Sequence, residues 1–123
     1  MIKAITPMLP VRDIAGAIHF YRDILGMTLD QFNHDLGWAA MNAEGVQLML
    51  SVAINKNPSL SRDGVIYLYP DNLDELHRQI VRFGYPVSEI CVTEYGMREF
   101  KMRDPDGNAI WIGERAESST ESS

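Results

Sequence analysis

The sequence predicts an α+β protein built from two copies of a βαβββ module, and three observations support this. Two segments of equal length, 13–26 and 71–84, each begin with Asp, end with Gly and carry apolar residues at helical spacing. Each segment is preceded by one strand-like run and followed by three more. A polar segment with Pro and Gly, 53–64, separates the two copies.

The two predicted helices share their end signals and their apolar pattern. Asp13 and Asp71 are suited to cap a helix N-terminus, and Gly26 and Gly84 are suited to the left-handed position that ends a helix. The apolar stripes consist of Ile14, Ile18, Tyr21 and Leu25 in the first helix, and of Leu73, Leu76, Ile80 and Phe83 in the second. Each helix is therefore expected to cover one face of a sheet.

The strand candidates are short apolar or alternating runs. The run before each helix, 4–11 or 64–70, is apolar on both faces, as expected of a strand covered on two sides. The runs after the helices are 27–33, 36–42 and 46–52 in the first module, and 85–92, 97–104 and 108–114 in the second. Pro105 and Gly107 predict a tight turn before the last strand, so Asp104 and Asp106 are interpreted as turn residues, not catalytic ones.

One domain is expected over residues 1–115, with module one at 1–52, a linker at 53–64 and module two at 65–115. Residues 116–123 are rich in Ser and Glu and are expected to form a disordered tail. A four-stranded sheet with one helix leaves one face bare. Two such sheets placed side by side would form an eight-stranded, cavity-enclosing split barrel with both helices outside.

Composition excludes several classes of function. The net charge of −6 argues against nucleic acid, because a phosphate backbone requires a basic surface. No apolar run is long enough to span a membrane, and the first residues lack the pattern of a signal peptide, so a cytoplasmic protein is expected. The single cysteine, Cys91, is either a buried apolar residue or a reactive nucleophile. The buried role is favoured, because no Lys, Arg or His adjoins it in sequence.

Alternation along the strands predicts which side chains face the cavity. If Ile110 and Ile112 face the helix, Trp111 faces the other way. The same argument predicts a ligand-binding set of Trp38, Met49, Val65, Tyr67, Tyr69, Glu99 and Trp111, with Thr6, Met8 and Gln47 also on the wall. Rings and methionines suit a flat, partly apolar organic molecule. The alternative is that these residues fill a second hydrophobic core.

Glu99 allows two interpretations. It is either a solvated charge at a sheet edge or a carboxylate inside the cavity. A carboxylate among aromatic rings would favour a cationic ligand or act as a general base.

Two stretches resemble the vicinal oxygen chelate superfamily, which includes glyoxalase I, extradiol dioxygenases, and fosfomycin- and bleomycin-resistance proteins: "PVRDIAGAIHFYRDILGM" and "YGMREFKMRDPDGNAIWIGE". The resemblance covers residues 1 to about 115. Metal-dependent members hold a ligand, usually His, Gln or Glu, in the first and fourth strands of each module. The matching positions here are Thr6, Met49, Val65 and Trp111, and none is a usual ligand of such a metal. The resemblance therefore implies no metal and no other cofactor.

The resemblance is closest to metal-free, bleomycin-resistance-like members, which bind and sequester a ligand as homodimers. It implies a homodimer, a role such as antibiotic resistance, and a ligand that is partly aromatic and, if Glu99 faces it, cationic. The alternative is a glyoxalase-like lyase or isomerase, or a dioxygenase, with atypical metal ligands or with Glu99 as base. His19 and His77, expected on helix surfaces, and His34, expected in a turn, are the remaining candidates for a metal site.

Overall fold

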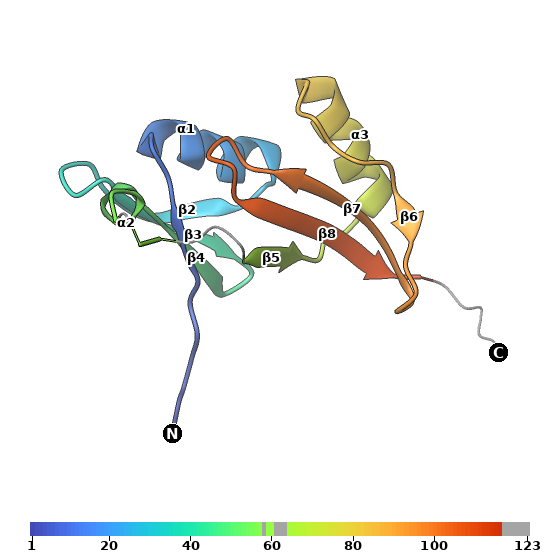
Figure 1. Cartoon of the computed structure of the whole chain (residues 1–123), viewed down its shortest axis with the longest axis horizontal. Coiled ribbons are helices and arrows are strands. Elements are labelled where there is room, and N and C mark those ends of the chain that lie inside the picture. The colour runs from blue at the N-terminus through green and yellow to red at the C-terminus, as the bar shows by residue number, and fades with distance from the viewer. Residues whose placement is uncertain (58, 61–63, 117–123) are drawn as a thin grey trace. The chain divides into compact units, whose positions relative to one another are not determined.

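The computed structural model describes residues 1–57, 59–60 and 64–116 (Figure 1). It confirms the α+β class, with two four-stranded sheets and their helices. The chain divides into two compact units, Met1–Arg62 with Asp104–Asn108, and Asp63–Arg103 with Ala109–Ser123. The placement of the two sheets side by side around a cavity stays a prediction.

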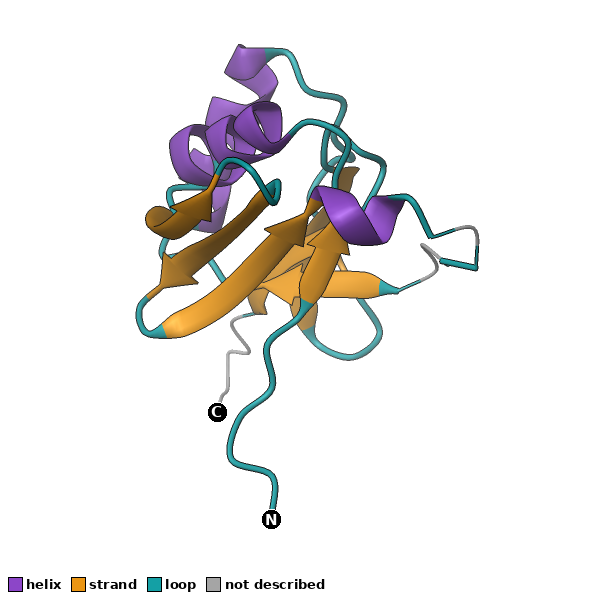
Figure 2. Ribbon diagram, turned by 90° about the vertical axis from the view of Figure 1, so that its left-hand side faces the viewer, coloured by secondary structure: helices purple, strands orange, loops and turns teal. Residues whose placement is uncertain are grey.

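The first sheet has the order β1-β4-β3-β2, and only β1 and β4 are parallel. Its strands are β1 (Met8–Pro10), β2 (Thr28–Asn33), β3 (Trp38–Ala43) and β4 (Val46–Ser51). Its helices are α1 (Ile14–His19), which continues as the π-helical turn η1 (Phe20–Ile24), and the short α2 (Val52–Asn55). The predicted linker therefore starts inside α2, the short purple helix on the right of Figure 2.

The second sheet repeats this order as β5-β8-β7-β6, with β5 and β8 parallel. Its strands are β5 (Val65–Leu68), β6 (Cys91–Val92), β7 (Met97–Arg103) and β8 (Ala109–Arg115). Helix α3 (Leu73–Phe83) contacts β8. Among the helices of the described ranges, none has both the length and the apolar character to cross a bilayer.

The predicted alternation is confirmed by burial. Leu48 and Leu50 in β4, and Ile110 and Ile112 in β8, are at most 4% exposed. Helix α1 contacts β3 and β4, and the ring of Phe100 in β7 packs edge-on against His77 of α3. The helices thus cover the faces that the apolar residues predicted.

The helix ends match the prediction with one correction. Asp13 caps α1, because its Oδ2 accepts a hydrogen bond from the Gly16 amide at 3.3 Å. Helix α3 is capped by Asn72, whose Oδ1 accepts from the Glu75 amide at 3.0 Å, so the prediction of Asp71 was wrong by one residue. Asp and Asn both cap helices well. Asn72 is the cap because the Glu75 amide, three residues further on, donates to its side chain.

Of the predicted strand 85–92, only β6 and one isolated bridge, between Val87 and Met102, form in the structure. The Oγ atom of Ser88 accepts the Lys101 amide at 2.8 Å, while the Ser88 carbonyl lies 2.8 Å from His77 Nε2. A side-chain oxygen therefore takes the place of a backbone acceptor, and a regular ladder does not form there.

The prediction that Cys91 is buried was wrong, because its thiol is exposed. Cys91 lies in the outermost strand of its sheet, and that strand has only two residues, so no further strand covers it. Of the predicted tail, Ala116 donates a backbone hydrogen bond to Gly96 at 2.8 Å, and residues 117–123 lie outside the described residues.

Candidate functional site

Three strands of the second unit each contribute one side chain to a row on the face opposite α3. Tyr67 in β5 pairs with Trp111 in β8, and Trp111 pairs with Lys101 in β7. Paired residues in adjacent strands point to the same face of a sheet. The neighbours Phe100 and Ile112 are fully buried on the opposite face, so the row faces away from the helix.

Glu99 lies next to this row and is buried. It pairs with Gly113 in β8 and is only 1% exposed. The hydroxyl of Tyr67 donates to its Oε1 at 2.8 Å, and the hydroxyl of Tyr95 lies 2.8 Å from both carboxylate oxygens. The interpretation of Glu99 as a solvated edge charge is therefore wrong. Two phenol groups satisfy the carboxylate that the sheet buries.

The absence of a side chain at Gly113 makes this cluster possible. A Cβ atom at this position would collide with the hydroxyl oxygen of Tyr67 and would lie 3.0 Å from the Cβ of Glu99. The glycine thus lets the Tyr67 ring extend across the sheet face to the carboxylate. A glycine within a strand pattern signals such a close approach, so the sequence held a clue that the alternation argument did not use.

Contact with the carboxylate also affects the two phenols. Burial, followed by the hydrogen bond to Glu99, raises the pKa of Tyr67 well above its usual value. The hydrogen bond to Glu99, followed by burial, raises the pKa of Tyr95. Both groups are therefore protonated at neutral pH and are held as hydrogen-bond donors to the carboxylate.

The rest of the face carries aromatic rings and one cation. The Nζ atom of Lys101 lies 4.1 Å from the centroid of the Trp111 ring, within the range of a cation–π interaction. The rings of Tyr67 and Tyr69 are 5.1 Å apart, and Tyr69 is 75% exposed. Val65 pairs with Ala109, which places its side chain on the same face as Tyr67.

Of the predicted binding residues, the structure thus brings Tyr67, Tyr69 and Glu99 into contact and places Trp111 on the same sheet face. The alternation argument missed Lys101 and Tyr95. Strand parity places Lys101 beside Glu99, but Tyr95 lies in a turn, where alternation predicts nothing.

The other predicted residues, Trp38, Met49 and Thr6, belong to the first unit. Met49 pairs with Met8 and with Ala40, two residues after Trp38, so Trp38 and Met49 share the face opposite Leu48 and Leu50. Thr6 is exposed and precedes β1. Gln47, also predicted on this wall, donates to Asp30 Oδ2 at 2.9 Å.

The three histidines lie apart and have other partners. His19 Nδ1 lies 2.8 Å from Asp23 Oδ2 on the helix surface, and His77 contacts the Ser88 carbonyl. His34 is in a turn, with a side chain that is 85% exposed. Within residues 1–57, 59–60 and 64–116, no three His, Cys, Asp or Glu residues group closely enough to hold a metal ion.

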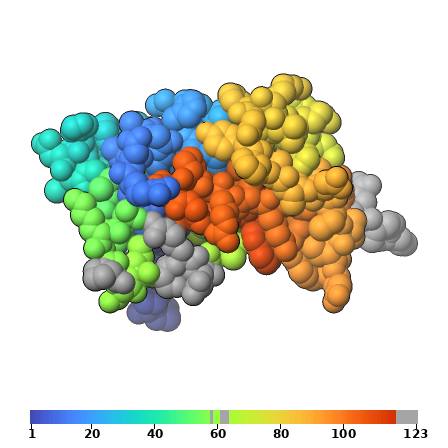
Figure 3. Space-filling view, turned by 45° about the horizontal axis from the view of Figure 1, so that its top comes forward, coloured from blue at the N-terminus to red at the C-terminus, as the bar shows by residue number. Residues whose placement is uncertain are grey.

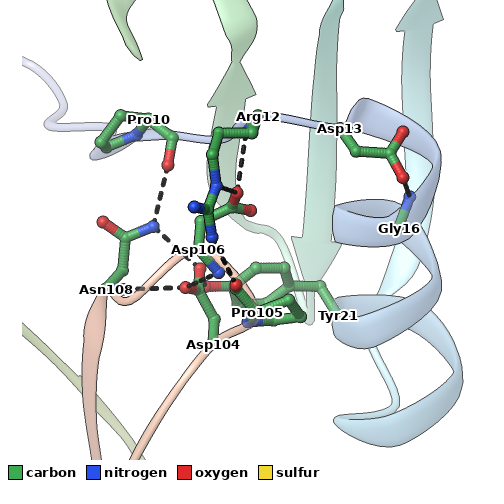
Figure 4. Close-up of polar contacts among 9 residues, drawn as sticks. All are labelled: Pro10, Arg12, Asp13, Gly16, Tyr21, Asp104, Pro105, Asp106 and Asn108. Atoms are coloured by element: carbon green, nitrogen blue, oxygen red, sulfur yellow. Dashed lines mark hydrogen bonds and ion pairs between the residues drawn. The ribbon is translucent and has the colours of Figure 1, made fainter.

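The turn 104–108 forms a second buried polar cluster, within the first unit (Figure 4). Gly107 has a positive φ of 87°, as a tight turn at this position requires, and its amide donates a hydrogen bond to the Asp104 carbonyl at 3.0 Å. Arg12 Nε lies 3.1 Å from Asp106 Oδ1, and Asn108 Nδ2 donates to the Pro10 carbonyl at 2.9 Å. In Figure 3 the orange-red atoms of this turn lie against the blue atoms of the segment before α1.

Asp104 is the centre of this cluster and is 4% exposed. Its carboxylate accepts four hydrogen bonds, from the Tyr21 hydroxyl, from the amides of Asp106 and Asn108, and from the Asn108 side chain. Burial, followed by the charge of Asp104, raises the pKa of Tyr21 well above its usual value. These residues have a structural role, since every partner of the carboxylate belongs to the turn or to η1.

The fold is thus that of an α+β protein with two βαβββ modules, the second of which carries a face of aromatic side chains. The sequence profile of the Glyoxalase/Bleomycin resistance protein/Dioxygenase superfamily matches residues 3–112, and the chain belongs to this superfamily. The chain is 30% identical over 127 residues to the bleomycin resistance protein of Geobacillus stearothermophilus, with 89% of this chain and 94% of the relative covered. The bleomycin resistance protein of Staphylococcus aureus strain MRSA252 matches with the same values.

Solved structures show the same fold. Lactoylglutathione lyase from Agrobacterium tumefaciens has a TM-score of 0.73 and 21% identity, with 92% of this chain and 94% of that chain covered. A superfamily member from Sphaerobacter thermophilus has a TM-score of 0.75 and 20% identity, with 94% and 98% covered. At these identities the similarity establishes the fold and leaves the reaction open.

Proposed function

We propose that this protein binds and sequesters a small, partly aromatic, cationic compound without the help of a metal ion. The observation that carries the proposal is the sheet face shared by Tyr67, Trp111 and Glu99, on which a buried carboxylate is held by the hydroxyls of two tyrosines. Aromatic rings bind flat apolar groups, and both the rings and the carboxylate attract positive charge. The 30% identity to bleomycin resistance proteins supports a resistance role.

The chemistry of the aligned positions supports a metal-free mode. Thr6, Met49, Val65 and Trp111 stand where the resemblance places the ligands of metal-dependent members. An indole, a thioether and an alkyl group are poor partners for a divalent cation that prefers imidazole or carboxylate. We also propose, from the resemblance, that the protein works as a homodimer. Light scattering after gel filtration should then give the mass of two chains.

The contacts of Glu99 favour binding over catalysis. Its side chain is 1% exposed, and its oxygens already accept hydrogen bonds from Tyr67 and Tyr95. A general base needs an oxygen within reach of the proton that it removes. A carboxylate covered in this way acts at short range through its charge and through the phenol rings that it polarises.

The test of this proposal begins with metal analysis of protein purified without chelators. A panel of planar cationic and neutral aromatic compounds is then titrated while tryptophan fluorescence is recorded. We expect no stoichiometric metal, and a change in fluorescence that is lost in Trp111→Leu. Stoichiometric zinc, nickel, manganese or iron would contradict the proposal, as would a flat response to the whole panel.

The role of the carboxylate is tested with Glu99→Gln. Loss of a charge at short range should weaken binding of cationic compounds about fivefold to tenfold, at roughly 1 kcal/mol for a partly screened charge. Neutral analogues should bind nearly as before. The matched control is Glu114→Gln, which removes a carboxylate paired with Arg98 at 2.8 Å in the same sheet. Equal weakening of cationic and neutral compounds in Glu99→Gln would instead indicate a structural role for Glu99.

A further inference from the structure

The aromatic face already holds a cation of the chain itself. Lys101 pairs directly with Trp111 across β7 and β8, and its ammonium group lies 4.1 Å from the centre of the indole ring. Its backbone amide and carbonyl are both bonded to Ser88, at 2.8 and 3.0 Å. The Lys101 backbone is thus held in place, while its side chain is exposed.

The position of this ammonium group is unusual for an exposed lysine. In the part of the chain that the structure describes, no carboxylate forms an ion pair with Lys101. Glu99, two residues earlier on the same face of β7, is engaged by Tyr67 and Tyr95. The Lys101 ammonium therefore takes the ring face of Trp111 as its partner, which marks that ring face as a place where a monocation is stable.

We propose that Lys101 determines the specificity of this site. Its ammonium group occupies the position that the cationic group of an aryl ammonium ligand takes on Trp111, and such a ligand binds by displacing it. The inference rests on the proposed function and names the ligand class, an organic monocation attached to an aromatic ring. The displaced lysine turns into solvent, where an exposed ammonium is well hydrated.

Two effects of Lys101 oppose a cationic ligand. Displacement gives up the contact between lysine and ring, and the displaced ammonium still repels a second positive charge nearby. A neutral aromatic ligand also has to displace Lys101 from the ring, but the displaced ammonium group does not repel it. Lys101 therefore lowers the preference for cations. Its removal should raise that preference about threefold to tenfold, the range of a screened like charge at short distance, because the lost lysine–ring contact affects both kinds of ligand equally.

The experiment compares two probes of the same shape, phenyltrimethylammonium and its neutral isostere tert-butylbenzene. Their affinities are measured by calorimetry or fluorescence for the wild type, for Lys101→Met, and for Lys101→Arg. The ratio of cation affinity to neutral affinity should rise threefold to tenfold in Lys101→Met, which keeps an unbranched side chain but loses the charge. In Lys101→Arg the ratio should stay within twofold, because the charge remains.

Displacement itself can be observed by NMR. The chain has three lysines, Lys3, Lys56 and Lys101, and the first two are exposed. In the free protein the ε-methylene signal of Lys101, assigned from its loss in Lys101→Arg, should be shifted upfield by the Trp111 ring. Saturating phenyltrimethylammonium should move that signal to the position of Lys3 and Lys56.

The outcomes separate this inference from the proposed function. If both probes bind but their ratio is unchanged in Lys101→Met, or if the Lys101 signal stays upfield while the cation is bound, the inference is wrong and the binding role stands. If neither probe binds any of the three proteins, the proposed aromatic binding face fails, and the inference fails with it.

Discussion

The hydroxyl group of Tyr21 should contribute about 2 kcal/mol to the free energy of unfolding, a magnitude typical of a buried hydrogen bond to a charged group. The Tyr21 side chain is fully buried, and its Oη donates to Asp104 Oδ2 at 2.7 Å. Asp104 keeps three other donors, from Asp106 and Asn108, at 2.8 to 2.9 Å. Tyr21→Phe therefore weakens the cluster without leaving the carboxylate bare.

The magnitude follows from two contributions. The lost charge-assisted bond accounts for about 1.5 to 3 kcal/mol, and the small void left by one oxygen atom adds a few tenths. For a chain of 123 residues this corresponds to a decrease in Tm of roughly 6 to 10 °C.

Urea unfolding followed by far-UV circular dichroism measures this change, with Tyr69→Phe as the matched control. Tyr69 is 75% exposed, so removal of its hydroxyl should alter stability by less than about 0.5 kcal/mol. A loss in Tyr21→Phe as small as in the control would refute the assignment of the Asp104 cluster as a buried anchor.

The same residue predicts a dependence on alkaline pH. In the folded chain burial and Asp104 raise the pKa of Tyr21 above its unfolded value of about 10, so the fold favours the protonated phenol. Its contribution is fully present below pH 10 and is lost as the pH rises above that value. The free energy of unfolding should therefore fall as the pH rises above about 10, and less steeply in Tyr21→Phe than in the wild type. Equal slopes would contradict the argument.

Two further predictions concern single positions, each with a control in the same chain. Gly113→Ala should destabilise the protein by about 2 to 3 kcal/mol, because the new methyl group collides with the Tyr67 hydroxyl. Gly64→Ala, where no atom of the described residues lies within 4 Å of the added carbon, should be neutral in the same urea titration, and equal effects would refute the close-approach argument. Asn72→Ala should cost about 1 kcal/mol through the lost cap of α3, and Asp71→Ala much less. A larger loss of stability in Asp71→Ala than in Asn72→Ala would instead identify Asp71 as the cap.

Much of the fold was predictable because its signals are local. The period of the helices, their terminal glycines and the alternation of Leu48, Leu50, Ile110 and Ile112 depend on residues a few positions apart. Repetition of the pattern in both halves strengthened each assignment. Where a local signal was ambiguous, as between Asp71 and Asn72, the prediction missed by one residue.

Part of the candidate site was also predictable from the sequence. Parity along the strands placed Tyr67, Glu99 and Trp111 on one face, and the register confirms this. Parity cannot tell whether a charged side chain on that face is solvated. The burial of Glu99 depends on Tyr95, which lies in a turn, and on the absence of a side chain at Gly113.

The two βαβββ modules and the faces of their strands follow from local sequence patterns, because backbone hydrogen bonding and hydrophobic burial impose periods of two and of 3.6 residues on any chain. Three further features became visible only in the folded chain: the hydrogen bond between Tyr21 and Asp104, the exposure of Cys91, and the contact of Lys101 with the Trp111 ring. These contacts depend on distances between atoms of segments that are separate in the sequence, and on which neighbours exclude water. No periodic pattern encodes either quantity.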